Sequence, residues 1–243
     1  MSQKHPIISV IGSSGAGTST VKHTFDQIFR RENVNAISIE GDAFHKFDRE
    51  NMKKELKKRT SAGDSTFSHF SFDANILKDL EKVFKAYSES GTGKTRNYVH
   101  SEEEAERFGV APGKFTDWRD IEMGSDLLFY EGLHGAVVTE DVNVAQYADL
   151  KIGVVPVTNL EWIQKIVRDT SERGHSREKV MGSIVRSMDD YINHMTPQFS
   201  RTHINFQRVP TIDTSNPFSE TSIPCLDESF VIIRFRDTTN IDF

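Results

Sequence analysis

A glycine-rich turn near the N-terminus contains the residues whose types and spacing most directly suggest chemistry. Gly12, Gly15 and Gly17 let backbone N–H groups close around an anion, and a helix expected to follow points its positive dipole end at the same place. Against the phosphate-loop motif G-x-x-x-x-G-K-S/T, the glycines and Ser19 fit, but Thr18 stands where lysine is expected. The turn therefore predicts a nucleotide phosphate site that lacks its usual cation. The residues expected to contact ATP are Gly12, Ser13, Ser14, Gly15, Ala16, Gly17, Thr18, Ser19 and Thr20.

Phosphoryl transfer also needs magnesium, cations around the transferred group and a base for the acceptor hydroxyl. Glu131 ends an apolar strand, where a phosphate-loop enzyme holds magnesium directly or through water, so Glu131 and Ser19 are the candidate metal residues. Asp42 follows another predicted strand and is the candidate base. The candidate cations lie on one predicted helix and at its end, where they would replace the charge lost at Thr18: Lys165, Arg168 and Arg173.

Three further side chains are suited to a second, anionic substrate. His45, Arg49 and His100 supply the several donors that bind a phosphate ester. Each has a structural alternative, because a single histidine is more often a packed residue and a charged helix face is more often solvated. The residues together indicate a small-molecule kinase whose acceptor is phosphorylated or rich in hydroxyls.

The predicted elements place these residues at one edge of a sheet. The apolar, β-branched run at 7–11 reads as a strand buried on both faces, and parallel strands bind ligands beyond their carboxyl ends. We predict an α/β fold of the P-loop NTPase type: a mostly parallel sheet with helices on both faces, plus short additional strands. The other predicted strands span 36–40, 98–100, 127–130, 152–157, 209–212 and 230–235.

Helices are predicted between these strands. An amphipathic pattern covers 73–87, and a capping box at Thr158 and Glu161 opens the helix that ends near Gly174. Ser176 opens another helix, which Pro197 limits. A basic helix around Met52 is expected to be a solvated flap, and the Gly-Lys-Thr within 91–95 follows a helix rather than a strand, so it is expected to be a turn.

Composition limits the class of protein. The net charge of −6 and the 27% of charged residues argue against a general nucleic-acid binder. No apolar stretch is long enough for a membrane span, and the polar start indicates no signal peptide, so the expected compartment is the cytoplasm. With no linker or repeat, residues 1–243 are expected to form one domain. Cys225, the single cysteine, excludes an internal disulfide and is expected to be a small packed residue.

Five strings of the sequence closely resemble bacterial-type phosphoribulokinases. They stand at 12–20, 40–45 (Glu-Gly-Asp-Ala-Phe-His), 129–135 (Phe-Tyr-Glu-Gly-Leu-His-Gly), 159–166 and 213–218, and the resemblance covers essentially the whole chain. It implies ATP-dependent phosphorylation of ribulose 5-phosphate at its 1-hydroxyl, which gives ribulose 1,5-bisphosphate and ADP for the Calvin cycle. It also implies Mg²⁺ with ATP, no redox cofactor in catalysis, and a homo-oligomer that acts on neither nucleic acid nor membranes.

The resemblance also implies individual roles. Asp42 matches the family's base, which accepts the proton of the 1-hydroxyl. Asp169 and Glu131 match positions near magnesium or the reacting centre, and Lys165 matches the residue that acts on the transferring phosphoryl group. The residues implied around the sugar phosphate or nucleotide are His45, Arg49, His100, Arg168 and Arg173. Within the family Thr18 is no anomaly. The resemblance further implies NADH as an activator that acts at effector positions matching Arg31 and Arg234, and it implies that the family continues beyond the position of residue 243.

The sequence leaves two other functions open. The first is a kinase of the same build with another acceptor, such as a nucleoside or pantothenate. The second is a nucleotide-sensing module, which would use the glycine-rich turn but would have no need for Asp42.

Overall fold

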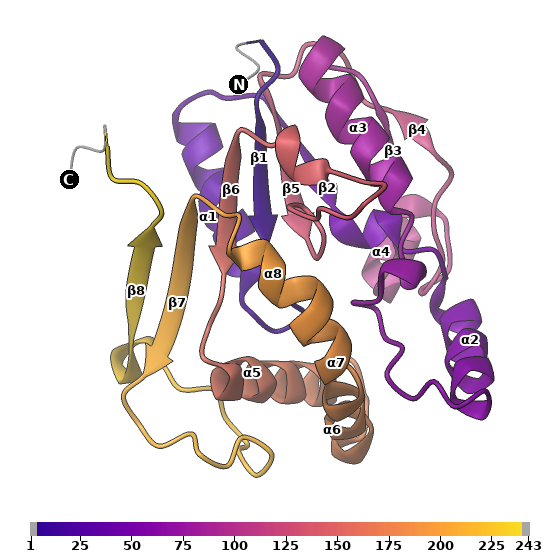
Figure 1. Cartoon of the computed structure of the whole chain (residues 1–243), viewed down its shortest axis with the longest axis vertical. Coiled ribbons are helices and arrows are strands. Elements are labelled where there is room, and N and C mark those ends of the chain that lie inside the picture. Colours follow the sequence, from indigo (N-terminus) through magenta and orange to yellow (C-terminus); the bar gives the residue numbers. More distant parts are fainter. Residues whose placement is uncertain (1–3, 240–243) are drawn as a thin grey trace.

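A six-stranded sheet runs through the centre of the computed structural model, which describes residues 4–239 (Figure 1). The strand order is β2-β5-β1-β6-β7-β8, in which the first five strands are parallel and β8 pairs antiparallel with β7. The predicted mostly parallel α/β fold is therefore confirmed. The strands are β1 (Ile7–Ile11), β2 (Ala36–Glu40), β5 (Leu127–Gly132), β6 (Leu150–Val154), β7 (Ile204–Pro210) and β8 (Ser229–Phe235).

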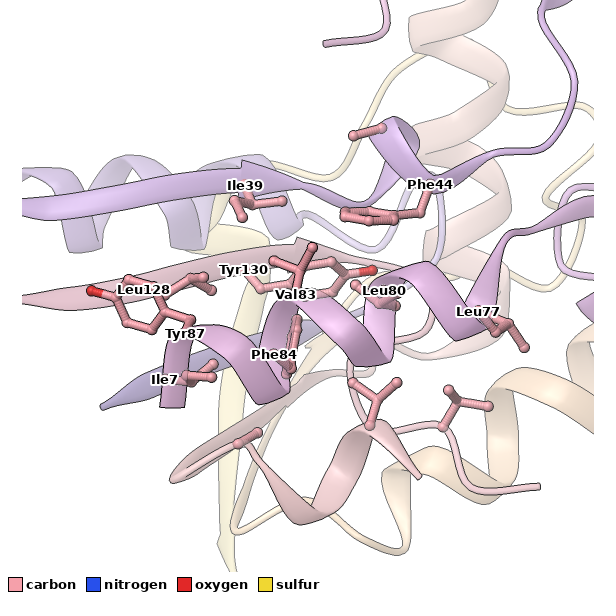
Figure 2. Packing of buried hydrophobic residues seen from close by; sticks show 14 of the residues in the cluster. Ile7, Ile39, Phe44, Leu77, Leu80, Val83, Phe84, Tyr87, Leu128 and Tyr130 are labelled. Atoms are coloured by element: carbon pink, nitrogen blue, oxygen red, sulfur yellow. The ribbon is translucent and has the colours of Figure 1, made fainter. Parts of the chain in front are cut away.

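Helices cover both faces of this sheet. Successive side chains of a strand point to opposite faces, so an unbroken apolar strand needs a packing partner on each face. On one face, Phe25 and Phe29 of α1 (Thr18–Arg31) pack against Phe129 of β5. On the other face, α3 (Leu77–Ser90) buries its apolar side against the neighbouring β5 residues Leu128 and Tyr130 (Figure 2). The continuous apolar run of β5 is thus explained by burial on both sides.

The carboxyl ends of the parallel strands carry the candidate site. Glu40 of β2 lies opposite Glu131 of β5, and Gly132 lies opposite Ile11 at the end of β1. A 3₁₀ turn, η1 (Gly41–Phe44), follows β2 and is held by Phe44, whose side chain is fully buried in the same core as Ile39 and Leu80 (Figure 2). Helix α5 (Thr158–Ser171) crosses below these strand ends in Figure 1.

Shorter elements complete the described chain. Strands β3 and β4 form a separate antiparallel pair, and a π-helical turn, η4, continues the helical path from α7 to α8. No helix within residues 4–239 is both long and apolar enough to cross a membrane. These elements are α2 (Arg49–Ser61), η2 (Phe72–Ala74), β3 (Lys94–Thr95), α4 (Glu102–Phe108), β4 (Arg119–Asp120), η3 (Val144–Gln146), α6 (Arg177–Arg186), α7 (Met188–Asp190), η4 (Tyr191–Met195), α8 (Thr196–Phe199) and η5 (Leu226–Glu228).

The predicted start of α5 at Thr158 is confirmed, but the capping box expected there is absent. Val157 is the N-cap without a side-chain hydrogen bond, and the Glu161 carboxylate instead accepts from Ser13. Pro197 does not end the preceding helical run. It lies in the first turn of α8, which continues the helical path of η4 and ends at Phe199.

Other local predictions also need correction. Residues 98–100 form no strand, only a single bridge between Tyr98 and Phe115. Helix α2 is not a wholly solvated flap, because Met52 is 3% exposed and packs with Phe67. Cys225 is exposed rather than packed, and its backbone N–H donates to Glu228.

Candidate active site

The glycine-rich turn has the backbone geometry of an anion cradle. Gly15 and Gly17 have φ angles of 118° and 96°, in the left-handed region that favours glycine, and Gly17 is the N-cap of α1. Thr18, at the position of the missing lysine, is buried, with a hydrogen bond between its side chain and the Glu131 carboxylate. Thr18 therefore ties the turn to the end of β5 instead of supplying a cation.

Gly15 is the position where a side chain is least tolerable. A Cβ atom there would lie 2.8 Å from the carbonyl oxygen of Glu161 in α5, and the backbone would be strained as well. We therefore expect Gly15→Ala to weaken ATP binding by about tenfold, because about 1.4 kcal/mol, which lies within the usual cost of such strain, changes the Kd by that factor. Equilibrium titration with ATP checks this. Gly63→Ala is the matched control, since Gly63 also has a positive φ but no neighbour within 4 Å; equal affinity of the two variants would contradict the prediction.

Helix α5 lies directly against the turn. Ser13 Oγ donates to the Glu161 carboxylate, and the Arg168 guanidinium donates to Ser14 Oγ at 2.8 Å. The Cβ atom of Lys165 is 3.0 Å from the place that a Gly15 side chain would occupy. The structure therefore brings Lys165 and Arg168 to the turn that lacks a lysine.

Asp169 gathers the cations of α5 and the loop after it. Its carboxylate lies 2.9 Å from Lys165 Nζ, 2.8 Å from Arg168 Nη2 and 3.3 Å from Arg173 Nη1. Burial opposes ionisation of Asp169, but the charges of Lys165 and Arg168 outweigh it and hold the pKa of Asp169 below its usual range. Burial likewise lowers the pKa of Lys165, and Asp169 opposes that effect. Asp169 thus keeps three cations in place beside the turn.

Asp42 lies between two histidines at the start of η1. Its carboxylate is 3.0 Å from Nε2 of His45 and 3.3 Å from Nε2 of His100, and 37% of its side chain remains exposed. Burial alone would raise the pKa of Asp42, but His45 and His100 hold it well below its usual range. Asp42 is therefore an ionised acceptor that an incoming hydroxyl can still reach.

Arg49 lies beside this group at the start of α2. Its guanidinium donates to the carbonyl oxygen of His100 at 3.1 Å, and its backbone N–H donates to Gly113 at 2.9 Å. Sequence positions 42, 45, 49 and 100 therefore meet in space, as the interpretation of a second anionic substrate requires.

Two residues at this site were missed by sequence reasoning. Arg96 donates to the carbonyl oxygens of Ala43 and His45, both at 2.8 Å, and clamps the backbone around Asp42. Oδ1 of Asn75 accepts from Nδ1 of His45 at 2.9 Å. Neither residue belongs to a sequence motif that could have identified it. Arg96 follows the Gly-Lys-Thr that we expected to be a turn, and that prediction was wrong for Lys94 and Thr95, which form β3. Asn75 falls within a predicted helix that begins only at Leu77.

Glu131 and Ser19 provide oxygen donors at the loop end of β5 and the first turn of α1. Burial raises the pKa of Glu131, and the Thr18 hydrogen bond only partly offsets this. A divalent cation would favour the ionised form of this half-buried carboxylate. Within residues 4–239, no group of three or more histidine, cysteine or acidic side chains could hold a metal ion. Any magnesium here would depend on phosphate oxygens and water for its other ligands, as Mg²⁺ commonly does.

The two predicted effector residues lie away from the carboxyl ends of the parallel strands. Arg31 is the last residue of α1 and pairs with Glu32 at 2.8 Å. Arg234 is exposed on β8, opposite Asn205 of β7. Their role stays a prediction.

The fold and this site define the class of protein: a glycine-rich phosphate turn after a central strand, a carboxylate at the end of the adjacent strand and a basic helix over the turn are the parts of a P-loop kinase. Comparison with known proteins narrows the class. The chain belongs to the phosphoribulokinase/uridine kinase family, whose model matches residues 7–215.

Its relatives within that family are similar along the whole chain. Phosphoribulokinase 1 of Cereibacter sphaeroides is 67% identical over 100% of this chain and 84% of that protein. The phosphoribulokinase of Nitrobacter vulgaris is 60% identical, again over 100% of this chain and 84% of that protein. The solved structure of the phosphoribulokinase from Rhodobacter spheroides superimposes with a TM-score of 0.89 at 63% identity, covering 99% of this chain and 83% of that chain.

Proposed function

We propose that the protein is a phosphoribulokinase: it transfers the γ-phosphoryl group of ATP to the 1-hydroxyl of D-ribulose 5-phosphate and gives ribulose 1,5-bisphosphate and ADP, a step of the Calvin cycle. One observation carries the proposal. In a chain 67% identical to a named phosphoribulokinase, a reachable carboxylate, Asp42, lies with His45, His100 and Arg49 at the sheet edge that also bears the phosphate turn.

Each part of the site has a task in this proposal. The turn from Gly12 to Thr20 binds the ATP phosphates through its backbone N–H groups. Asp42 orients the 1-hydroxyl and accepts its proton, while His45, Arg49 and His100 bind the sugar phosphate. Lys165, Arg168 and Arg173 stabilise negative charge on the transferred group, and Asp169 holds them in position.

Magnesium is assigned to Ser19 and Glu131, whose hydroxyl and carboxylate oxygens are ligands that Mg²⁺ prefers. When held there with ATP, Mg²⁺ would neutralise negative charge on the phosphates. The prediction that Asp169 also contacts magnesium is retained as a proposal, although its two oxygens face cations here. No redox cofactor takes part in the reaction.

A substrate panel tests the proposed function. A coupled assay of ADP release should give turnover with ribulose 5-phosphate and none above background with ribulose, uridine or pantothenate. Phosphorylation of the product at the 1-position is checked by phosphorus NMR. ADP release with uridine but not with ribulose 5-phosphate would instead identify a nucleoside kinase of the same family.

The proposal includes regulation and assembly. We expect a cytoplasmic enzyme, since both substrates are water-soluble phosphorylated metabolites. The family resemblance further leads us to expect a homo-oligomer in which NADH activates through Arg31 and Arg234. These two arginines are exposed on α1 and β8, so they are accessible to an anionic effector.

A further inference from the structure

Asn75 has only one arrangement of its side-chain amide that suits its neighbours. Nδ2 donates to the carbonyl oxygens of His69 at 2.9 Å and Ser71 at 2.8 Å. Because carbonyl oxygens cannot donate, the amide nitrogen must face them, and Oδ1 must face Nδ1 of His45, 2.9 Å away. An amide oxygen only accepts, so the proton of this hydrogen bond belongs to Nδ1 of His45.

This proton position constrains the other ring nitrogen of His45. Nε2 lies 3.0 Å from Asp42 Oδ1. In a neutral imidazole with a proton on Nδ1, Nε2 carries a lone pair that would face a carboxylate oxygen. The contact is favourable only if a further proton lies between Nε2 and Oδ1, which makes His45 an imidazolium beside the Asp42 carboxylate.

We propose that Asn75 is a positioning residue that fixes a proton on Nδ1 of His45, so that His45 reaches Asp42 only in its doubly protonated form. His45 then supplies a positive charge at the acceptor site, and catalysis depends on its protonation. The proposal rests on the proposed function only for the identity of the acceptor.

The surroundings of His45 favour it as the charged imidazole. His45 and Asn75 are 6% and 9% exposed, so solvent does not replace their contacts. Burial lowers the pKa of His69 and of His134 to about 3, which leaves both rings neutral, whereas Asp42 outweighs burial and raises the pKa of His45. The titratable and charged groups that face His45 are Asp42, His69, Arg96, Tyr98 and His134.

Two substitutions separate this role from a purely structural one. Asn75→Leu removes the acceptor at Nδ1, which should move the alkaline limb of the kcat/KM profile for ribulose 5-phosphate to lower pH by about one unit. Asn75→Asp keeps an acceptor and adds a negative charge, which should move the same limb to higher pH. Asn205→Leu is the matched control on β7, where Asn205 also donates to a backbone carbonyl, at 3.2 Å from Phe199. Loss of activity without opposite displacements of the limb would overturn the proposal.

A direct measurement on the unmodified protein keeps the proposal testable if either variant fails to fold. Nitrogen-15 NMR of the imidazoles, with His45 assigned by loss of its signals in His45→Gln, should show both nitrogens of His45 protonated at pH 7. A neutral ring with its proton on Nε2 would overturn the proposal. This readout needs no substrate, so it can succeed or fail independently of the substrate panel.

Discussion

Asp42→Asn is expected to lower kcat for ribulose 5-phosphate by roughly two orders of magnitude or more, the usual contribution of a positioned base. Asparagine keeps the size of the side chain but cannot take the hydroxyl proton. The carboxylate lies on a turn held by Phe44 in the core and by Arg96 on the backbone, so the loss should come from chemistry rather than from displacement of the turn. ATP binding should change little, because Asp42 follows β2 whereas the phosphate turn follows β1.

Steady-state kinetics and ATP titration check this prediction together. Asp120→Asn is the matched control, since its side chain on β4 is 82% exposed and no part of the site uses it. Turnover of nucleotide that is the same in Asp42→Asn and the unmodified protein would favour the alternative of a nucleotide-sensing module, which needs a phosphate turn but no base.

The parallel sheet and its helices could be predicted because their signal is local. The β-branched run at 7–11 predicts a buried strand, and the helical spacing of Phe25 and Phe29 predicts a helix that packs on the sheet. Because ligands bind beyond the carboxyl ends of parallel strands, the order of strands and helices then predicts that Gly12, Asp42 and Glu131 lie at one edge of the sheet. Burial of β5 on both faces likewise follows from its unbroken apolar run.

What the sequence could not show depends on contacts between distant segments. The spacing of Glu161 from Thr158 matched a capping box. In the folded chain, however, the Glu161 carboxylate accepts a hydrogen bond from Ser13, 148 positions away. Asn75 looked like part of an amphipathic helix, and Arg96 followed a misleading Gly-Lys-Thr. Tertiary packing brings Asn75 to His45 and Arg96 to the carbonyl oxygens around Asp42. Such contacts leave no periodic pattern in the sequence from which they could be predicted.

Lys165→Met should lower kcat by about 100- to 1,000-fold, the cost of removing one preorganised group that stabilises transition-state charge, while changing ATP affinity far less. The backbone N–H groups of the turn bind the ground-state phosphates without Lys165, so the lysine matters most where charge develops during transfer. Methionine retains the apolar stem. Asp169 would keep Arg168 at 2.8 Å and Arg173 at 3.3 Å, so no buried carboxylate is left unpaired and the fold should persist.

The measurement must separate ATP binding from turnover, because a cation beside the phosphate turn could contribute to either one. ATP titration gives the affinity, and single-turnover kinetics give the rate of phosphoryl transfer. Lys151→Met is the matched control, since Lys151 is also a half-buried lysine but donates to the carbonyls of Ala145 and Ala148 at the opposite end of β6 from α5. Weakened ATP binding with turnover intact would contradict the assignment. It would mean that Lys165 merely replaces the lysine missing at Thr18 as a ground-state ligand, and that Arg168 and Arg173 carry the charge of the transition state.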